Sequence, residues 1–308
     1  MSITKVKTAN HEEWKDLRSR YIGGSDAAAV VGLNSYSSPY SLWAEKTGRL
    51  SGFDGNLATE VGTFLEEFVA QKFAEVTGKK VRRANHSFFN SDYPWAIANI
   101  DREIVGEDAG LEIKTTDSLN LKKFKNGEYP EHYYVQCVHY LAVTGCKKWY
   151  LAVLVLGEGF YYFEIERDEG EINALMESEE AFWKYVESKT PPATDGMTST
   201  TDTITILYPE SNGETVNLLA YEADLKSYMT FSSLIKDIER QRDEVANRIK
   251  AFLGEAGRGE SDNYKVSWST TSRSTFDSKR FASDNPDIDL SEYYKKSTYR
   301  TFKVTKNK

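Results

Sequence analysis

Two charged residues alternate with apolar ones in the segment LEIKTT, residues 111–116. Successive side chains of a strand point to opposite faces, so Glu112 and Lys114 would share one face. A carboxylate and an ammonium side by side form either an ordinary ion pair, which stabilises a surface by under ~1 kcal/mol, or part of a catalytic site. Which of the two applies depends on the other side chains that reach the same face.

Asp101 is the first side chain that can join this pair. It ends the segment AIANID, eleven residues before Glu112. A strand, a tight turn and a second strand of that length place the two acids next to each other in an antiparallel hairpin. Magnesium is held in proteins by one or two carboxylates together with water and phosphate oxygens. The spacing therefore predicts a magnesium site, where Lys114 would orient an attacking water and stabilise transition-state charge.

The elements that must position these residues follow from the hydrophobic periodicity. A short helix is expected from residue 11, and an Ala-rich helix follows Gly23 and Gly24 with Ser25 or Asp26 as its N-cap. Residues 58–78 form the clearest amphipathic helix, and strands are expected at 81–90, 96–105 and 110–116 as a meander. A helix over 131–145, two strands at 147–157 and 160–167 and a helix over 169–189 complete the pattern. The sequence predicts a mixed α/β (α+β) fold with a central mixed sheet flanked by helices.

A second domain is expected after a segment rich in Pro, Thr and Asp at residues 190–202. We assign residues 1–195 to the catalytic domain and 196–308 to an appendage. Apolar residues at spacings of three and four from Leu218 to Phe252 predict a helix of over thirty residues, interrupted in its stripe near Gln241 and Arg242. Such a helix suits a coiled-coil arm or a lid, and the segments 264–270 and 297–305 are expected to form a final pair of strands.

Composition narrows the functional class. The chain has 308 residues and a net charge of −8, and no apolar run approaches the ~20 residues that span a bilayer. Its two cysteines cannot supply a disulfide framework or four thiolates for an iron–sulfur cluster. We place the protein in a cytoplasm. Local basic clusters at 78–83 and 122–125 are either solvated faces or contacts to phosphate.

Asp101 followed by Glu112-Ile113-Lys114 resembles the core of the PD-(D/E)xK nucleases, although the Pro of that name is absent before Asp101. Three further stretches, at 18–48, 62–73 and 133–145, surround this motif in order. Together they resemble the YqaJ-type viral recombinase family and, more distantly, the exonuclease of phage lambda, over roughly residues 10 to 190. Residues after 200 find no counterpart in the lambda enzyme.

The resemblance implies a set of metal ligands and catalytic groups. Lys114 and Gln136 are the expected catalytic side chains beside the acids, and His132 and His139 are not needed. Two Mg²⁺ ions per site are implied, with Mn²⁺ as a substitute. Their ligands would be Asp101, Glu112 and the Ile113 carbonyl for one ion, and Glu66 and Asp101 for the other.

The resemblance also implies how DNA is held. Arg18 and Ser25 match the pair that binds the 5′-phosphate of the strand end, with Arg20 as an alternative to Arg18. A Ser at a helix start after two glycines is a plausible anion site in its own right, and an ordinary N-cap is the alternative interpretation.

The expected activity is a magnesium-dependent 5′-to-3′ exonuclease on linear double-stranded DNA. It would release mononucleotides and leave a 3′ single strand for recombination by annealing. By resemblance the protein is a phage or prophage product in a bacterial host, assembles as a trimeric ring, and passes its product to a single-strand annealing protein. A structure-specific endonuclease on the same core and a non-catalytic DNA- or partner-binding module are the alternatives.

Overall fold

The computed structural model describes residues 2–7, 11–52 and 55–307, and packing divides the chain into two units, one up to Tyr208 and one from Pro209. Helix α8 (Thr198–Leu207) belongs to unit 1, where the Thr200 hydroxyl donates to Ser38 Oγ at 2.7 Å. The sequence placed the end of the catalytic domain at 195, ahead of this helix. The functional division into a catalytic domain and an appendage stays a prediction.

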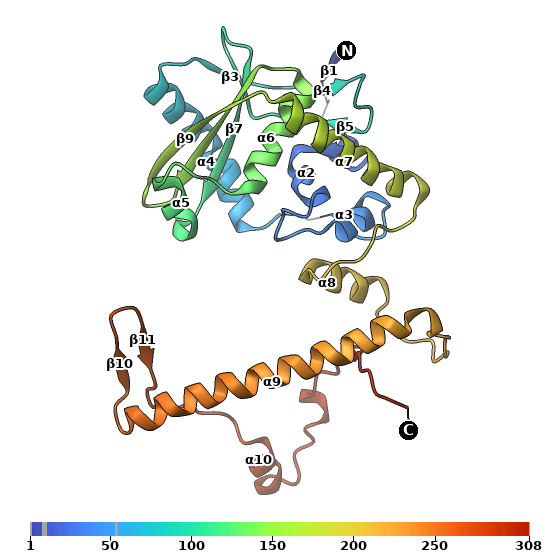
Figure 1. The fold of residues 1–308 in the computed structure, drawn as a ribbon, viewed down its shortest axis with the longest axis vertical. Helices are drawn as coiled ribbons and strands as arrows, with labels where there is room; N and C mark the ends of the chain where they lie inside the picture. Colours follow the sequence, from blue (N-terminus) through green and yellow to red (C-terminus); the bar gives the residue numbers. More distant parts are fainter. Residues whose placement is uncertain (1, 8–10, 53–54, 308) are drawn as a thin grey trace. The chain divides into compact units, whose positions relative to one another are not determined.

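Unit 1 is built on a five-stranded sheet (Figure 1). The strands pair antiparallel except β7 (Ala109–Thr116) and β8 (Lys148–Val155), which run parallel and are joined by the crossover helix α6 (Glu131–Thr144). The predicted mixed sheet with flanking helices is confirmed. In spatial order the strands are β3 (Val81–Arg83), β6 (Arg102–Ile104), β7 (Ala109–Thr116), β8 (Lys148–Val155) and β9 (Gly159–Glu166).

The expected meander is wrong in one respect, because two of its segments leave the main sheet. Strand β4 (Ser87–Asn90) pairs antiparallel with β1 (Ile3–Val6), and β5 (Ala96–Ile97) pairs parallel with β2 (Ile22–Gly23). Both pairings are with segments at least seventy residues away in the chain, which local patterning does not reveal. The β2–β5 pair anchors the start of the Ala-rich helix.

The two faces of the sheet carry different helices. Leu111 and Ile113 of β7 pack with Val69, Ala70 and Phe73 of α4 (Leu57–Thr77), whereas Leu151 of β8 packs in the core that contains α6. Each fully buried Leu or Ile contributes about 1.5–3 kcal/mol. Because side chains alternate, the face opposite Leu111 and Ile113 receives Glu112 and Lys114, toward α6.

The amphipathic helix α4 is only partly covered. Phe73 is fully buried, but Phe64 and Phe68 are 84% and 53% exposed. The apolar stripe expected from the sequence therefore meets the sheet only in its C-terminal half. The helix ends at Gly78, which takes a left-handed φ of 71°.

The remaining helices of unit 1 surround α6. Helix α2 (Gly24–Val30) packs against α6, α3 (Pro39–Lys46) and α7 (Glu169–Ser188). Gly23 is the N-cap of α2, and the carboxylate of Asp26 accepts a hydrogen bond from its N–H at 3.0 Å, so the expected cap at Ser25 or Asp26 is wrong. Asp26 instead fills the third helical position, from which a side chain reaches back to the cap. These elements are α1 (His11–Ser19), α2 (Gly24–Val30), α3 (Pro39–Lys46), η1 (Ser118–Asn120), α5 (Leu121–Lys125) and α7 (Glu169–Ser188).

Unit 2 contains the predicted long helix, α9 (Glu222–Leu253). The expected final strand pair is wrong. Residues 264–270 supply β11 (Lys265–Ser267), whose partner is the adjacent β10 (Arg258–Glu260), and 297–305 carry no strand in the described chain. Pairing with the adjacent β10 closes a shorter loop than pairing with a segment thirty residues later, and therefore costs less chain entropy. The other elements are η2 (Leu219–Tyr221), α10 (Ser278–Asp284) and η3 (Ser291–Tyr293). Among the described helices of both units, none has the length and apolar character to cross a bilayer.

Candidate active site

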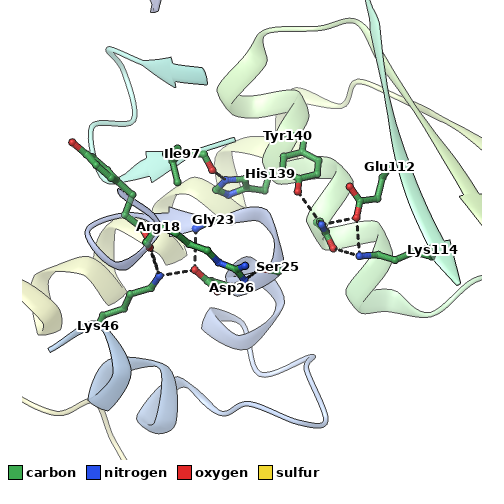
Figure 2. A network of polar contacts seen from close by, with 12 residues as sticks. Arg18, Gly23, Ser25, Asp26, Lys46, Ile97, Glu112, Lys114, His139 and Tyr140 are labelled. Carbon is green, nitrogen blue, oxygen red and sulfur yellow. Dashed lines mark hydrogen bonds and ion pairs between the residues drawn. The ribbon is translucent and has the colours of Figure 1, made fainter. Parts of the chain in front are cut away.

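Glu112, Lys114 and Gln136 form a closed network on the α6 face of the sheet. Figure 2 shows Glu112 and Lys114 side by side. Lys114 Nζ lies 2.7 Å from Glu112 Oε1 and donates to Gln136 Oε1 at 2.8 Å. Gln136 Nε2 donates to Glu112 Oε1 at 2.7 Å. The Lys114 side chain is 23% exposed whereas that of Glu112 is 4% exposed, so Lys114 is the more accessible residue of this pair.

Tyr140 supports this network and was not singled out by the sequence. Its hydroxyl accepts from Gln136 Nε2 at 2.9 Å. Gly24 of α2 lies against its ring, since a Cβ built there would sit 2.5 Å from Tyr140 Cε1. Tyr140 could have been found from its spacing, because residues four apart on one helix, such as Gln136 and Tyr140, lie on the same face. Tyr133 presents its ring to Lys114, with Nζ 5.4 Å from the centroid.

Asp101 joins the site through the backbone of β7. Its Oδ2 accepts from the Ile113 N–H at 2.8 Å. The antiparallel register pairs Arg102 with Leu111, which places Asp101 opposite Glu112. Burial and the neighbouring carboxylates of Glu112 and Glu66 raise the pKa of Asp101 well above its usual range, although Lys114 acts in the other direction. The carboxyl groups of Asp101 and Glu112 thus lie close together beside the ammonium of Lys114.

Lys114 is a cation in this arrangement. Burial lowers its pKa, but the carboxylate of Glu112 outweighs that effect and raises the pKa above the ordinary lysine value. An ammonium that keeps its proton at neutral pH serves as a donor and a positive charge, and does not serve as a general base.

Glu66, the expected helical acid, is held by arginines. Its Oε1 pairs with the buried Arg102 and lies 3.5 Å from Arg83 Nη2. Arg102 also donates to the Asp101 carbonyl at 2.8 Å and contacts Glu67 at 3.0 Å. Within the ranges that the structure covers, no three His, Cys, Asp or Glu side chains are arranged to hold a metal ion. The sequence missed Arg102, whose position directly after Asp101 was the available signal.

The chemistry of the donors nevertheless fits a hard divalent cation. Glu112 Oε2 is buried, and among the described residues it has no hydrogen-bond partner. An orphaned buried carboxylate oxygen is costly unless a donor or a cation satisfies it. Asp101 and Glu112 offer oxygen ligands, which Mg²⁺ and Mn²⁺ prefer.

Arg18 and Ser25 meet at the start of α2 (Figure 2). Arg18 Nη2 donates to Ser25 Oγ at 2.6 Å. Arg20, the alternative to Arg18, is instead paired with Asp16 at 2.8 Å on an exposed surface. The structure therefore brings together the pair Arg18 and Ser25.

A buried lysine fixes this corner. Lys46 of α3 donates to the carbonyls of Arg18 and Tyr21 at 2.9 and 2.8 Å and to Asp26 Oδ2 at 2.7 Å. Burial raises the pKa of Asp26, but Lys46 and Arg18 outweigh it and hold the pKa below its usual value. Lys46 was missed by the sequence, since a lysine near a helix end ordinarily projects into solvent.

The two histidines considered in the sequence differ. His139 is fully buried between Glu179 Oε1, at 2.8 Å, and the Ile97 carbonyl, at 3.0 Å. His132 is half-buried and pairs its ring edge-on with that of Tyr133. Neither makes a hydrogen bond to Asp101, Glu112 or Lys114 in the described part of the chain.

Comparisons with known proteins agree with this architecture. The family model described as YqaJ-like viral recombinase domain matches residues 13–147. A Bacillus subtilis (strain 168) protein named "Uncharacterized protein YqaJ" is 35% identical over 98% of this chain and 96% of its own length. The alkaline exonuclease LHK-Exo from Laribacter hongkongensis, in complex with dAMP, superimposes with a TM-score of 0.50 at 20% identity. That match covers 58% of this chain and 94% of the other, and it shows a shared fold.

Proposed function

The chain belongs to the YqaJ-like viral recombinase family, and from that membership we propose that it is a metal-dependent exonuclease that digests linear double-stranded DNA from the 5′ end. The observation that carries this proposal is the Glu112–Lys114–Gln136 network beside Asp101, with a buried Glu112 oxygen unsatisfied in the described chain. The fold relative LHK-Exo is an alkaline exonuclease and was crystallised with dAMP, which supports the same class of activity.

The proposed roles follow from the contacts. Asp101, Glu112 and the Ile113 carbonyl would hold one Mg²⁺, and Glu66 with Asp101 would contribute to a second. A bound divalent ion supplies Lewis-acid stabilisation of the phosphate and a more acidic water. For Glu66 to contribute, its ion pairs with Arg102 and Arg83 must loosen.

The protein groups act around the scissile phosphate. The Lys114 ammonium donates a hydrogen bond to the attacking water or to a phosphate oxygen, and so stabilises charge that develops in the transition state. Gln136 fixes Lys114 and Glu112 in one geometry through its two hydrogen bonds. Since Tyr140 holds the Gln136 amide, the orientation of that amide is set from α6 itself.

Arg18 and Ser25 would bind the terminal 5′-phosphate. A guanidinium and a hydroxyl that already share a hydrogen bond are arranged to donate to one anion. We extend the proposal to the assembly implied by resemblance, a ring-shaped trimer that acts at DNA ends, leaves a 3′ single strand and passes it to a phage annealing protein.

Digestion of a linear duplex labelled at the 5′ or the 3′ end, with a covalently closed circle as control, tests the activity. In Mg²⁺ or Mn²⁺ we expect early loss of the 5′ label as mononucleotide, an intact circle and no reaction in chelator. Cutting of the circle would move the protein to the endonucleases. No cutting of any substrate would favour the non-catalytic binding module.

A further inference from the structure

Helix α9 carries a heptad pattern along its length that is broken at two positions. With Tyr221 at position a, the a and d positions hold Tyr228, Phe231, Ile235, Ile238, Val245, Ile249 and Phe252, interrupted by Asp224 near the start and Arg242 in the second half. The alternating steps of three and four average 3.5 residues. This is the period at which two helices supercoil around each other with a and d side chains interlocked.

The stripe is uncovered within unit 2. Its apolar members after Tyr221 are between 42% and 92% exposed, from Tyr228 and Ile249 to Phe252. The e positions beside it, by contrast, are partly covered, as at Leu225, Ser232, Ala246 and Leu253. Among the described side chains, Phe302 reaches the stripe edge-on at Tyr228, with ring centroids 5.4 Å apart. An apolar row about 48 Å long on a 32-residue helix is larger than scattered surface residues explain.

The residues that interrupt and end the stripe identify its partner. In a parallel pair in register, Arg242 would face Arg242 of the other helix, and like charges in an apolar seam are strongly unfavourable. In an antiparallel pair centred between Lys236 and Asp237, Ile235 meets Ile238 of the other helix. The same alignment sets Tyr228 against Val245 and Tyr221 against Phe252.

The antiparallel register also satisfies the charges. It places the guanidinium of Arg242 against the ring of Phe231, a favourable cation–π arrangement. The acidic first turn, with Glu222 and Asp224, comes to lie beside Arg248 and Lys250 near the C-terminal end, so Asp224, whose seam partner is Ile249, lies between two cations. Each helix thus supplies the complement of the other, and a second copy of the same helix fits.

We propose that α9 is a dimerisation arm that forms an antiparallel two-stranded coiled coil with α9 of a second copy of this chain. The contact is two-fold symmetric and self-complementary. It is compatible with any ring that unit 1 forms, because a two-fold contact can join two such rings. The α9 pair would then join copies of the chain through a contact that is separate from any contact made by unit 1.

Light scattering of the full-length protein tests the contact. The pair Ile235→Asp and Ile238→Asp puts two carboxylates in the central layer, and we expect the particle mass to fall by half. Ser233→Asp with Asn247→Asp adds the same charge at f positions on the opposite face of α9 and leaves the mass unchanged. An unchanged mass in the Ile235/Ile238 variant overturns the proposal, and is the result expected if α9 instead packs on its own catalytic unit or on a different protein.

Cross-linking tests the register. Tyr221→Cys and Phe252→Cys chains, each with Cys146→Ser, are mixed, re-equilibrated and oxidised. We expect disulfides between the two kinds of chain and few between identical chains. Disulfides joining Tyr221→Cys chains to one another would overturn the antiparallel arrangement. Circular dichroism of each variant verifies that the long helix remains, so a loss of mass or of cross-links is not a loss of fold.

Discussion

Figure 2 shows two buried networks of carboxylates and cations, one around Asp26 of α2 and one around Glu112 beside α6. Their carboxylates have pKa values shifted in opposite directions. Asp26 is matched by the Gly23 N–H, Lys46 and Arg18, and its pKa lies below the usual value because these partners outweigh burial. Asp101 and Glu112 share one ammonium, that of Lys114, and burial together with the neighbouring acids raises the pKa of Asp101 well above its usual range.

The opposite pKa shifts of Asp26 and Asp101 suggest different roles for the two networks. A carboxylate whose donors fully compensate its charge fixes chain segments, here the Arg18 and Tyr21 carbonyls that Lys46 also binds. Carboxylates with too little positive charge around them are stable as anions only if a cation joins them. We therefore propose that the Asp26 network maintains the fold and that the Asp101–Glu112 network binds metal and substrate.

Removal of the Lys114 ammonium gives the largest expected effect. Lys114→Met keeps most of the side-chain volume but removes the donor that lies beside Glu112 and Gln136. Cleavage of end-labelled duplex should fall roughly a thousandfold, while DNA binding, measured by fluorescence anisotropy, is retained. Lys184→Met on α7, which removes the exposed partner of Glu180, is the control and should cleave like the wild type. Undiminished cleavage by Lys114→Met would remove Lys114 from the mechanism.

The same substitution in the compensated network should act on stability. The side chain of Lys46 is 2% exposed. Its replacement by Met removes the nearest cation from the buried Asp26 and leaves the guanidinium of Arg18 at 3.9 Å. Breaking a buried pair costs about 3–5 kcal/mol in the free energy of unfolding, which urea titration measures. The concentration of Mg²⁺ needed for half-maximal cleavage should not change. A shifted Mg²⁺ requirement with normal stability would show that the two networks do not divide as described.

A smaller effect is expected at the proposed 5′-phosphate site of Arg18 and Ser25, next to the Asp26 network. Arg18→Ala removes the guanidinium that donates to Ser25 Oγ and would contact the 5′-phosphate. Because a hydrogen bond to a charged group contributes about 1.5–3 kcal/mol, the preference for phosphorylated over unphosphorylated 5′ ends should fall at least about tenfold. Arg20→Ala, which removes the partner of Asp16, is the matched control. An equal loss of preference in both variants would contradict the assignment to Arg18.

Local sequence was sufficient for much of this comparison and insufficient for the rest. The alternation in β7 predicts that Glu112 and Lys114 share a face, and the hairpin spacing predicts that Asp101 lies opposite; both relations are present in the structure. The long helix α9 was predicted from periodicity because its stripe does not depend on any other element.

What was missed depends on contacts between distant segments. Lys46 reaches Asp26 across twenty residues, and Arg102 reaches Glu66 across thirty-six. Neither contact follows from propensity or period, because each requires the three-dimensional arrangement of helices on the sheet. The segments of β4 and β5 were expected to be strands, but their pairing with β1 and β2 needed the N-terminal segment to be placed first.

The smallest expected effect is a change in the free energy of unfolding, measured in chelator, that has opposite signs for Asp26→Asn and Asp101→Asn. Asp26 has a lowered pKa in the folded protein, so its ionised form contributes stability above its unfolded-state pKa, and that stability is lost as pH falls through the folded-state pKa. Asp26→Asn should therefore destabilise the protein at neutral pH.

Asp101 has the opposite linkage. With a folded-state pKa well above its usual range, the native state binds a proton more tightly than the unfolded state does, so its contribution to stability is present at low pH and is lost as pH rises.

Asn carries no charge and can still accept the Ile113 N–H. We expect metal-free Asp101→Asn to be more stable than wild type at pH 8, by on the order of 1 kcal/mol, with a smaller difference at pH 5. Mg²⁺ should then stabilise the wild type more than the variant. Urea titrations at both pH values decide the matter, because a destabilised Asp101→Asn at pH 8 would mean that the site is already compensated without a cation.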